Sequence, residues 1–317
     1  MHTVPDADAA PRLASGQLQH IGLLRFSGPD AGVFLQGQVS NDTRRLSAQE
    51  RLLAAYCTAQ GRVISVLHLL PHSSGIIALL PHDVLLPTMQ GLRKFVLRAK
   101  VEIADLSEQF GVFGQHGAEA LRAVGLPVPD AVNGYVEQGG LGVGRVHTGS
   151  SRYWLIGATE SLAEHGFAGS RDALTVERDW RLANIHAGLP QVYAPSSELF
   201  VPQMLNLDLI DGISFTKGCY TGQEIVARTQ HLGRIKRRMF RLALPPGNWA
   251  IGQALRLADG RAGRLTELAP VDEEFEALAV LNIEPVAADG EVTAGEAVAA
   301  GDLPLPYSPL ASTGATR

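Results

Sequence analysis

One cysteine lies in a setting that favours thiol chemistry. Cys219 belongs to the stretch KGCYTGQE, residues 217–224. Thr221 and Glu224 have the spacing of a capping box, which predicts a helix that starts after Thr221 and runs through IVARTQH. A helix start carries unpaired N–H groups and about half a positive charge, so it favours a thiolate. Lys217 is two residues from Cys219, and in an extended segment both side chains point the same way, so its ammonium would lower the pKa of the thiol further.

The alternative for any free cysteine is a buried, inert side chain, which is its usual state. Cys57, inside the apolar run RLLAAYCTA, fits that description. Around Cys219, a helix start and a lysine coincide with Gly218 and Gly222, which let the backbone turn tightly and leave the sulfur accessible. We therefore predict Cys219 and Lys217 as the catalytic residues.

A basic group follows the predicted helix: Arg234, Lys236, Arg237 and Arg238. In a strand, Arg234, Lys236 and Arg238 would share one face, where they could contact the phosphates of a tRNA or another anion. The alternative is a solvated strand face. The net charge of −5 provides no general basic field that would attract nucleic acid.

Several common motifs are absent. The glycine-rich GGLGVGRV lacks the G-x-G-x-x-G spacing of a dinucleotide site and fits a hairpin with flexible turns. There is no Walker-type loop, no H-E-x-x-H and no G-x-S-x-G. His68 and His72 are four residues apart, but Pro71 between them breaks a shared helix. We assign no metal site.

Composition limits the compartment and the cofactors. The chain has 317 residues, of which 45% are hydrophobic and 19% charged, a balance typical of two or three globular domains. Only two cysteines are present, which favours a reducing compartment and is too few for the four thiolates of a usual iron–sulfur site. The start, MHTVPDADAAPRLASG, has no basic or apolar region typical of a targeting signal, and no apolar run spans a bilayer. We expect a cytoplasmic protein without a membrane contact.

The first part of the chain predicts an α+β module. A strand in LQHIGLLRFSGP and a short helix in DAGVFLQGQV precede three strand-like runs, RLLAAYCTA, RVISVLHLLP and GIIALLP. The turn at Gln60–Gly61 predicts a hairpin between the first two of these runs. Residues 83–98 have apolar side chains at helical spacing, and VEIADL returns as a strand.

A similar alternation recurs after residue 110. FGVFG, LGVGRVH and RYWLIG are strand-like, AEALRAV and SLAEHGF are helix-like, and LTVERDW leads into a helix that ends near Gly188-Leu189-Pro190. Strand pairs mixed with single helices favour antiparallel α+β modules over one doubly wound sheet. We therefore expect residues 1–240 to form two modules, split near residue 110.

The pattern of apolar runs changes after Phe240. The runs FRLALP, ALRLAD, GRLTEL, ALAVLNI and AVAAG are short and closely spaced, and Gly and Asp separate them. This spacing predicts a small β-barrel over residues 241–305. Residues 306–317 are rich in Pro, Ser and Thr and are predicted to form a disordered tail.

The stretch KGCYTGQE resembles the signature of the YgfZ family, folate-binding proteins similar to the glycine-cleavage T-protein, an aminomethyltransferase. Near the N-terminus, FLQGQ at residues 34–38 and Asn41-Asp42 resemble the family's FLQGQ-x-x-ND. The segments AGLP at 187–190, FVPQ at 200–203 and Asn206-Leu207 match the family's spacing ahead of the signature. The resemblance covers residues 20–300.

This resemblance implies two ferredoxin-like modules and a C-terminal barrel around a central folate-binding channel. It implies a role in maintaining iron–sulfur enzymes, with links to tRNA modification, so iron–sulfur client proteins are the expected partners. Tetrahydrofolate or a derivative is the expected cofactor. The candidate cofactor-binding residues are Glu177, Asn184, His186, Tyr220, Gln223, Glu224 and Arg228.

The chain departs from the family ahead of the A-G-x-P element. Family members commonly have Arg-Ile-Glu where this chain has Asn184, Ile185 and His186. A carboxylate accepts two N–H bonds from a pterin, whereas a neutral histidine accepts only one. We therefore expect folate to bind weakly or differently, or to be replaced by another ligand. Glu177, Arg178 or Asp179, about two to three helical turns earlier, could substitute for the missing carboxylate.

Two other functions stay open. The T-protein-like architecture also fits a tetrahydrofolate-dependent one-carbon transferase or demethylase with an aminomethyltransferase-like activity. Such chemistry needs a carboxylate near the folate nitrogen to hold a substrate amine, and the sequence does not locate one. The basic group at residues 234–238 fits an RNA-binding module, although the acidic net charge opposes it.

Overall fold

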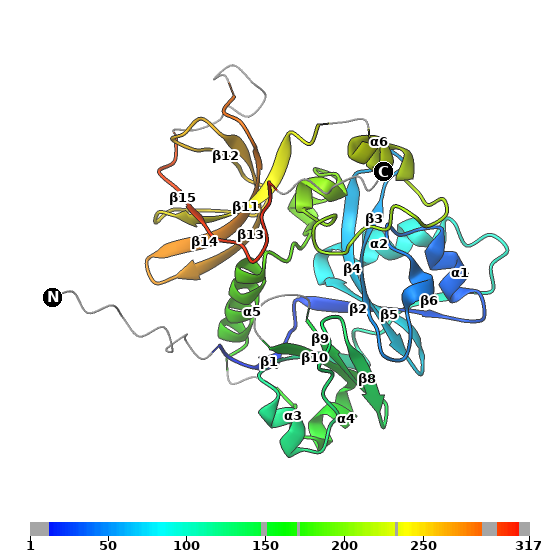
Figure 1. The fold of residues 1–317 in the computed structure, drawn as a ribbon. Coiled ribbons are helices and arrows are strands. Elements are labelled where there is room, and N and C mark those ends of the chain that lie inside the picture. Colours follow the sequence, from blue (N-terminus) through cyan, green and yellow to red (C-terminus); the bar gives the residue numbers. More distant parts are fainter. Residues whose placement is uncertain (1–12, 147–150, 170–171, 232–233, 287–296, 311–317) are drawn as a thin grey trace.

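The protein is an α+β assembly of three five-stranded antiparallel sheets, described from a computed structural model (Figure 1). The structure describes residues 13–146, 151–169, 172–231, 234–286 and 297–310. Two sheets belong to the N-terminal part of the chain, and the third follows residue 236. The predicted α+β class with antiparallel sheets is confirmed.

The first sheet has the order β3-β4-β5-β2-β6. Its strands and helices follow the chain as β2 (Ile21–Ser27), α1 (Ala31–Gln36), β3 (Leu52–Cys57), β4 (Val63–His72), β5 (Gly75–Pro81), α2 (His82–Arg93) and β6 (Glu102–Asp105). Without β3, these elements have the β-α-β-β-α-β order of a ferredoxin-like module, and β3 adds one strand at the edge beside β4. The predicted hairpin is present, because β3 and β4 pair on either side of the Gln60–Gly61 turn.

The second sheet has the order β1-β7-β10-β9-β8. It contains β1 (Gly16–Gln17), β7 (Phe110–His116), α3 (Glu119–Ala123), β8 (Tyr135–Gln138), β9 (Leu141–Arg145), β10 (Arg152–Ala158) and α4 (Thr159–Glu164). The strand β7 begins where the second module was predicted to start. However, its outer neighbour β1 comes from the N-terminal end of the chain, so the two sheets are not separated cleanly at residue 110.

A long helix connects these sheets to the last one. The helix α5 (Ala173–Ala187) lies between β1 and the third sheet (Figure 1). Asp172 caps its start by accepting hydrogen bonds from the amides of Leu174 and Thr175. It ends at Gly188, whose φ of 61° is left-handed and favours glycine. This is the predicted stop.

An irregular segment then contains two 3-10 turns, Ala194–Ser196 and Pro202–Leu205, and the helix α6 (Gln223–His231). The third sheet has the order β12-β13-β14-β11-β15, formed by β11 (Arg237–Leu244), β12 (Ala254–Arg256), β13 (Ala262–Val271), β14 (Glu274–Asn282) and β15 (Gly301–Leu303). An isolated bridge between Leu257 and Val298 joins the residue after β12 to the segment before β15. The described pairings define a sheet, and its closure into a barrel stays a prediction.

The main hydrophobic core joins the two N-terminal sheets, α5 and the segment after it. The C-terminal end of the described chain takes part in this packing. Leu305 and Tyr307 pack against the core, and the Tyr307 hydroxyl donates to the Gly188 carbonyl over 2.6 Å. The prediction of a disordered tail from residue 306 is therefore wrong at its start, because the partly buried ring of Tyr307 packs at the C-terminal end of α5. Residues 311–317 lie outside the described residues.

Candidate functional site

The signature stretch packs against the FLQGQ segment near the N-terminus. The Lys217 ammonium donates to the carbonyl oxygens of Gln36, Val39 and Asn41, each over 2.7 Å. The side chain is nearly buried, and its nitrogen lies 5.0 Å from the centre of the Tyr220 ring. An ammonium has three N–H donors, so all of them are used. The lysine therefore fixes the loop at residues 36–41 in one conformation.

Further hydrogen bonds extend this contact. The Thr221 amide donates to Gly37 O over 3.3 Å, and the Ser40 hydroxyl donates to Gly212 O over 2.7 Å. Asn41 donates from its amide nitrogen to the carbonyls of Leu53 and Asp211. We call this contact of residues 211–221 with residues 36–41 the signature junction. It brings together the two motifs on which the family resemblance rests.

Cys219 is exposed at this junction. The helix that follows it starts later than predicted, because α6 begins at Gln223 and Gly222 precedes it with a φ of 85°. The predicted capping box is not formed. The Thr221 amide bonds to Gly37, and the Glu224 carboxylate pairs with Arg228 on the surface instead of reaching back. The sulfur is thus accessible, but Cys219 precedes the first residue of the helix by four positions in the sequence.

The predicted role of Lys217 beside the thiol is corrected by this geometry. Its three donors point to backbone carbonyls, so none is left to pair with the Cys219 thiolate. Burial lowers the pKa of Lys217 to about 8, opposed by the nearby Asp42 carboxylate. The side chain clamps the loop, and it reaches the thiol only through the backbone that it positions.

Cys57 has the inert setting that was expected of it. It is buried in the first sheet, and burial raises the pKa of its thiol to about 12. A thiol in this state is neither a nucleophile nor a metal ligand at neutral pH. The two cysteines therefore differ in accessibility, and Cys219 is the exposed one.

The residues proposed to bind folate do not converge on one place. Glu177 pairs with Arg181, which also contacts the buried Glu267 of β13. His186 lies 3.1 Å from the Glu276 carboxylate of β14, so it faces the third sheet. Asn184 is buried on another side of α5, where its side-chain oxygen accepts from Arg152 over 2.9 Å.

The other candidates lie at α6. Tyr220 is buried beneath the Lys217 ammonium, and Gln223 is the first residue of the helix. Glu224 and Arg228 form an exposed pair one helical turn apart. The loop ahead of α6 rests on the turn between β3 and β4, because the Gly222 backbone touches Thr58 and Gly61. These residues thus belong to the signature junction and its surroundings.

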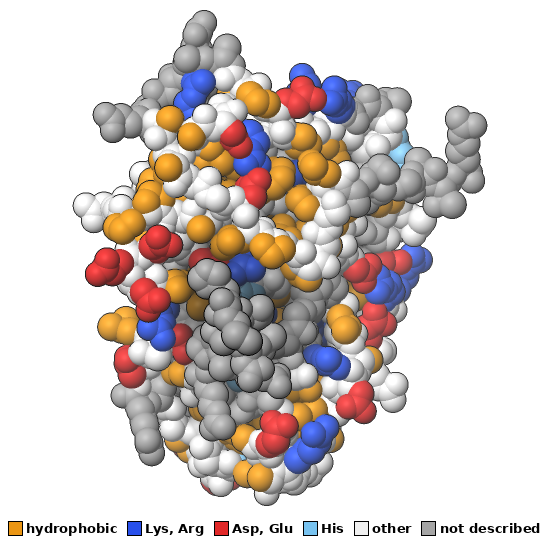
Figure 2. All heavy atoms as spheres, turned by 60° about the vertical axis from the view of Figure 1, so that its left-hand side comes forward, with side chains coloured by type: hydrophobic (Ala, Val, Ile, Leu, Met, Phe, Trp, Pro, Cys, Tyr) orange, Lys and Arg blue, Asp and Glu red, His pale blue; other side chains and the backbone are white. Residues whose placement is uncertain are grey.

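The predicted basic face at residues 234–238 is not formed. The strand β11 begins only at Arg237. Arg234 pairs with Glu284, and Arg238 is buried and holds Asp208 through two hydrogen bonds of 2.6 and 2.9 Å. Burial removes Arg238 from any phosphate, so the shared face is lost. On the face of the molecule in Figure 2, acidic and basic side chains are interspersed.

A second polar cluster, which the sequence did not reveal, lies where the two N-terminal sheets and α5 meet. Arg51 and Arg152 are both 0% exposed. The Arg51 guanidinium lies 5.0 Å from the Trp154 ring, and the Arg152 guanidinium lies 5.0 Å from the Trp180 ring. We call this cluster the arginine centre; it comprises Arg51, His68, Arg152, Trp154, Trp180, Asn184 and Gln191.

A sequence signal for the arginine centre existed. Each arginine stands at the start of a strongly apolar strand, Arg51 before LLAAYC and Arg152 before YWLIG. A charged residue there is ordinarily assigned to the strand end and solvent. The tertiary packing places both ends inside, because Arg51 lies against β9 and β10 and donates to the Arg145 carbonyl.

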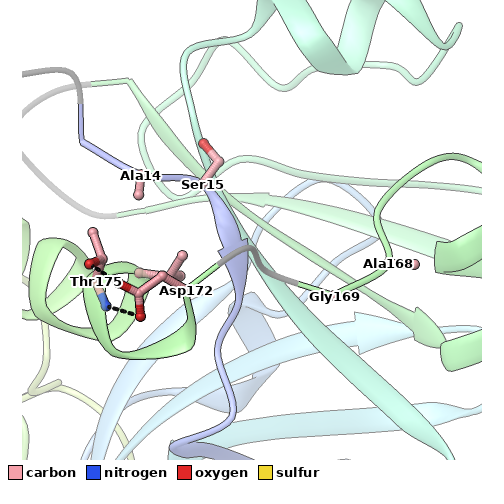
Figure 3. A pocket seen from close by; sticks show the side chains of 7 residues that line it. Ala14, Ser15, Ala168, Gly169, Asp172 and Thr175 are labelled. Atoms are coloured by element: carbon pink, nitrogen blue, oxygen red, sulfur yellow. Dashed lines mark hydrogen bonds between the residues drawn. The ribbon is translucent and has the colours of Figure 1, made fainter.

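A large surface hollow lies elsewhere, at the start of α5 (Figure 3). It has a volume of about 590 Å³, and Ala14, Ser15, Ala168 and Thr175 contribute to its lining. The Asp172 carboxylate points toward Thr175. It accepts hydrogen bonds from the Thr175 amide and hydroxyl and so caps the helix. The capping bonds occupy the one charged group of this hollow among the described lining residues.

Two kinds of feature are absent from the described residues. No helix there has the length and apolar character that a bilayer crossing requires. No group of three or more His, Cys, Asp or Glu side chains in that part of the chain could hold a metal ion.

Comparisons with known proteins add the following. No protein-family model matches the chain. The tRNA-modifying protein YgfZ of Colwellia psychrerythraea is 34% identical over 247 residues, which cover 75% of this chain and 74% of that protein. The tRNA-modifying protein YgfZ of Edwardsiella ictaluri is 36% identical over 238 residues, or 74% and 70% of the two chains.

Among solved structures, the chain is similar to glycine cleavage system aminomethyltransferase T from Bartonella henselae. The TM-score is 0.67 with 17% sequence identity, over 94% of this chain and 87% of the other. The fold is thus T-protein-like.

Proposed function

This chain belongs to the YgfZ family of tRNA-modifying proteins, and from that premise we propose that it is a folate-binding accessory protein of the cytoplasm that supports iron–sulfur proteins, including those that modify tRNA. In this proposal Cys219 supplies the reactive thiol. The iron–sulfur proteins are clients, since this chain has only two cysteines and one of them is buried.

The observation that carries the proposal is the signature junction. Two motifs far apart in the sequence are held together by the three bonds of Lys217, and the result is an exposed thiol on a rigid support. A site whose supporting residues are locked by hydrogen bonds holds its reactive group more accurately than a loose surface loop does. Lys217 acts here as a positioning residue.

Folate would be held at the arginine centre. A pterin offers ring nitrogens and a carbonyl, and its side chain ends in carboxylates, all of which accept hydrogen bonds. Arg51 and Arg152 have unused N–H donors beside the aromatic faces of Trp154 and Trp180, so the donor set fits an acceptor-rich aromatic ligand. Asn184 joins this set through Arg152. His186 faces Glu276, so a direct role for it in binding folate has less support.

The thiol is tested by complementation in a bacterium that lacks its own family member. The modified nucleosides of its tRNA and the activity of an iron–sulfur enzyme are measured with the wild-type chain, with Cys219→Ala and with Cys57→Ala as the matched control. We expect Cys57→Ala to restore both readouts and Cys219→Ala to restore neither. Full restoration by Cys219→Ala would exclude the thiol mechanism.

Folate binding is tested separately by titrating the purified protein with tetrahydrofolate and following tryptophan emission. Trp154 and Trp180 lie in the arginine centre, so a bound pterin would change their emission. A saturable response is expected. No response up to millimolar tetrahydrofolate would remove folate from the proposal and leave the thiol role standing.

A second candidate is a tetrahydrofolate-dependent one-carbon transferase or demethylase, which the T-protein-like fold favours. Such a reaction needs a carboxylate beside the folate nitrogen. The residues that define the arginine centre include no carboxylate. Incubation with tetrahydrofolate and a panel of aminomethyl and N-methyl donors tests this activity, and formation of a methylene- or methyl-folate product would establish it.

A further inference from the structure

The two arginines of the arginine centre have donors without acceptors. Arg51 donates from Nε to the Arg145 carbonyl over 2.6 Å, but both of its Nη atoms are buried and unpartnered. Arg152 donates from Nη1 to Asn184, while its Nε and Nη2 are buried and unpartnered. Nearly all buried polar groups in native proteins find a hydrogen-bond partner, so four such nitrogens in one place require an explanation.

Within the described part of the chain, the neighbours of these arginines carry no compensating negative charge. The guanidinium groups lie against Trp154 and Trp180, and the other members of the centre, His68, Asn184 and Gln191, are uncharged or basic. The carboxylate of Asp179 accepts from Arg178 and from the Ala14 amide. The burial of two like charges without an anion is costly, and their mutual repulsion adds to the cost.

Among the described residues, a further buried arginine and a half-buried one are both paired with carboxylates. Arg238 holds Asp208 in a two-pronged contact, and Arg181 contacts both Glu177 and Glu267. At these two sites, where an arginine stabilises the fold, the chain thus places a carboxylate opposite its guanidinium group. The arginine centre departs from that rule at two residues that meet from different sheets.

We infer that Arg51 and Arg152 form a receptor for an oxyanion, a carboxylate or phosphate group of a small ligand, at the place where the two N-terminal sheets meet α5. Guanidinium groups bind such anions through parallel N–H bonds, and the rings of Trp154 and Trp180, each 5.0 Å from one of them, provide an aromatic wall beside them. The inference concerns the centre at which the proposed function places folate and names the chemistry recognised there. The anion could be a carboxylate of folate or a group of another ligand.

The binding experiment uses the full chain with Trp249→Phe, so that emission comes only from Trp154 and Trp180. Sodium phosphate, sodium acetate and p-aminobenzoylglutamate are the oxyanion probes. Sodium chloride at matched ionic strength and a pterin without carboxylate are the controls. We expect a saturable emission change and a higher midpoint of thermal unfolding with at least one oxyanion probe.

The variants locate the site. Arg51→Gln and Arg152→Gln should each weaken the response about tenfold or more, because each removes a charge-assisted contact. Arg62→Gln, at an exposed arginine, should leave it unchanged. Arg51→Lys keeps the charge without the planar fork and should bind weakly, which provides a second variant if Arg51→Gln does not fold.

The outcomes separate this inference from the proposed function. A response equal to that of sodium chloride, or one that survives in both glutamine variants, overturns the oxyanion receptor. If tetrahydrofolate and the carboxylate-free pterin bind while no oxyanion probe does, the receptor is also overturned, and folate binding stands. If an oxyanion probe binds through Arg51 and Arg152 but no folate does, the receptor stands and the folate proposal fails.

Discussion

The signature junction and the arginine centre both bury positive charge, but the hydrogen-bond donors of that charge are all used at the junction and partly unused at the centre. At the junction, the Lys217 ammonium uses all three donors on backbone carbonyls of one loop. At the centre, Arg51 and Arg152 retain four nitrogens without acceptors. The contrast separates a buried cation that holds the fold together from buried cations to which the described residues offer no acceptor.

The difference also assigns roles to the two halves of the proposed function. A saturated cation has no capacity for a ligand, so Lys217 serves to position the loop below Cys219. Unsaturated cations stabilise a bound anion more than they stabilise the free fold, as is common where stability has been exchanged for function. The thiol and the ligand site are therefore distinct features, one on the surface and one inside.

The strongest test of this contrast uses a paired arginine. Arg238→Met should lower the free energy of unfolding by about 4 kcal/mol, because it leaves the buried Asp208 carboxylate without its partner. Urea denaturation monitored by circular dichroism measures the change. A loss below about 1 kcal/mol would mean that buried pairing contributes little in this protein, and the contrast would lose its basis.

A somewhat smaller loss is expected at the junction. Lys217→Met leaves the carbonyls of Gln36, Val39 and Asn41 buried without a donor, which should cost about 3 kcal/mol. The exposed Lys94→Met is the control and should change stability by less than about 0.5 kcal/mol. Stability and complementation should fall together in Lys217→Met, since its role is to hold the loop.

The opposite sign is expected at the arginine centre. Arg51→Met removes a buried charge with unused donors and leaves no stranded carboxylate, so the ligand-free protein should gain about 1 kcal/mol. The same urea experiment applies, without phosphate or carboxylate in the buffer. A loss of about 3 kcal/mol or more would show that Arg51 is as well satisfied as Arg238, and would contradict the unpaired state of the centre.

The charge of the centre also affects a neighbouring histidine. Burial, with a contribution from Arg152, lowers the pKa of His116 to about 4. Its folded pKa thus lies below the unfolded value of 6.5, so the unfolded chain binds more protons between these values, and stability should fall as the pH drops from 6.5 to 4. Because the ring is partly accessible, we expect a loss of about 1 kcal/mol.

An NMR titration of the His116 ring resonances checks this pKa. In Arg152→Met the pKa should rise toward 6.5, since a repelling charge is gone. Binding of an oxyanion to the wild-type chain should shift it in the same direction. An unchanged value in the variant would mean that the Arg152 charge is already neutralised by a partner.

The smallest effect on stability is expected at the thiol. Cys219→Ala should change the free energy of unfolding by less than about 0.5 kcal/mol, because the side chain is exposed. Iodoacetamide should alkylate Cys219 in the native protein and reach Cys57 only after unfolding, as peptide mass spectrometry can show. Native alkylation of Cys57 would indicate that the first sheet opens readily.

Local patterns predicted much of the fold and the exposed thiol. Apolar runs located most of the strands from Ile21 to Asn282, although β8 was not predicted, and the Gly188 stop ended α5 as expected. The capping box at Thr221 failed because the Gly37 carbonyl took the amide that the box requires. The short strand β1 and the ordered Tyr307 were missed, since partners distant in sequence stabilise them.

The sequence by itself determined the family, the α+β class and the two motifs around Lys217 and Cys219, because these depend on residue types at short spacing. Only the tertiary structure decided what each charge faces. In it, Lys217 donates to the backbone carbonyls of a loop, and Arg238 pairs with Asp208. Arg51 and Arg152 lie in a centre whose members include no acidic residue. The physical reason is that a charge in a folded protein is governed by groups brought close through space, and sheets and helices that pack from distant parts of the chain supply those groups.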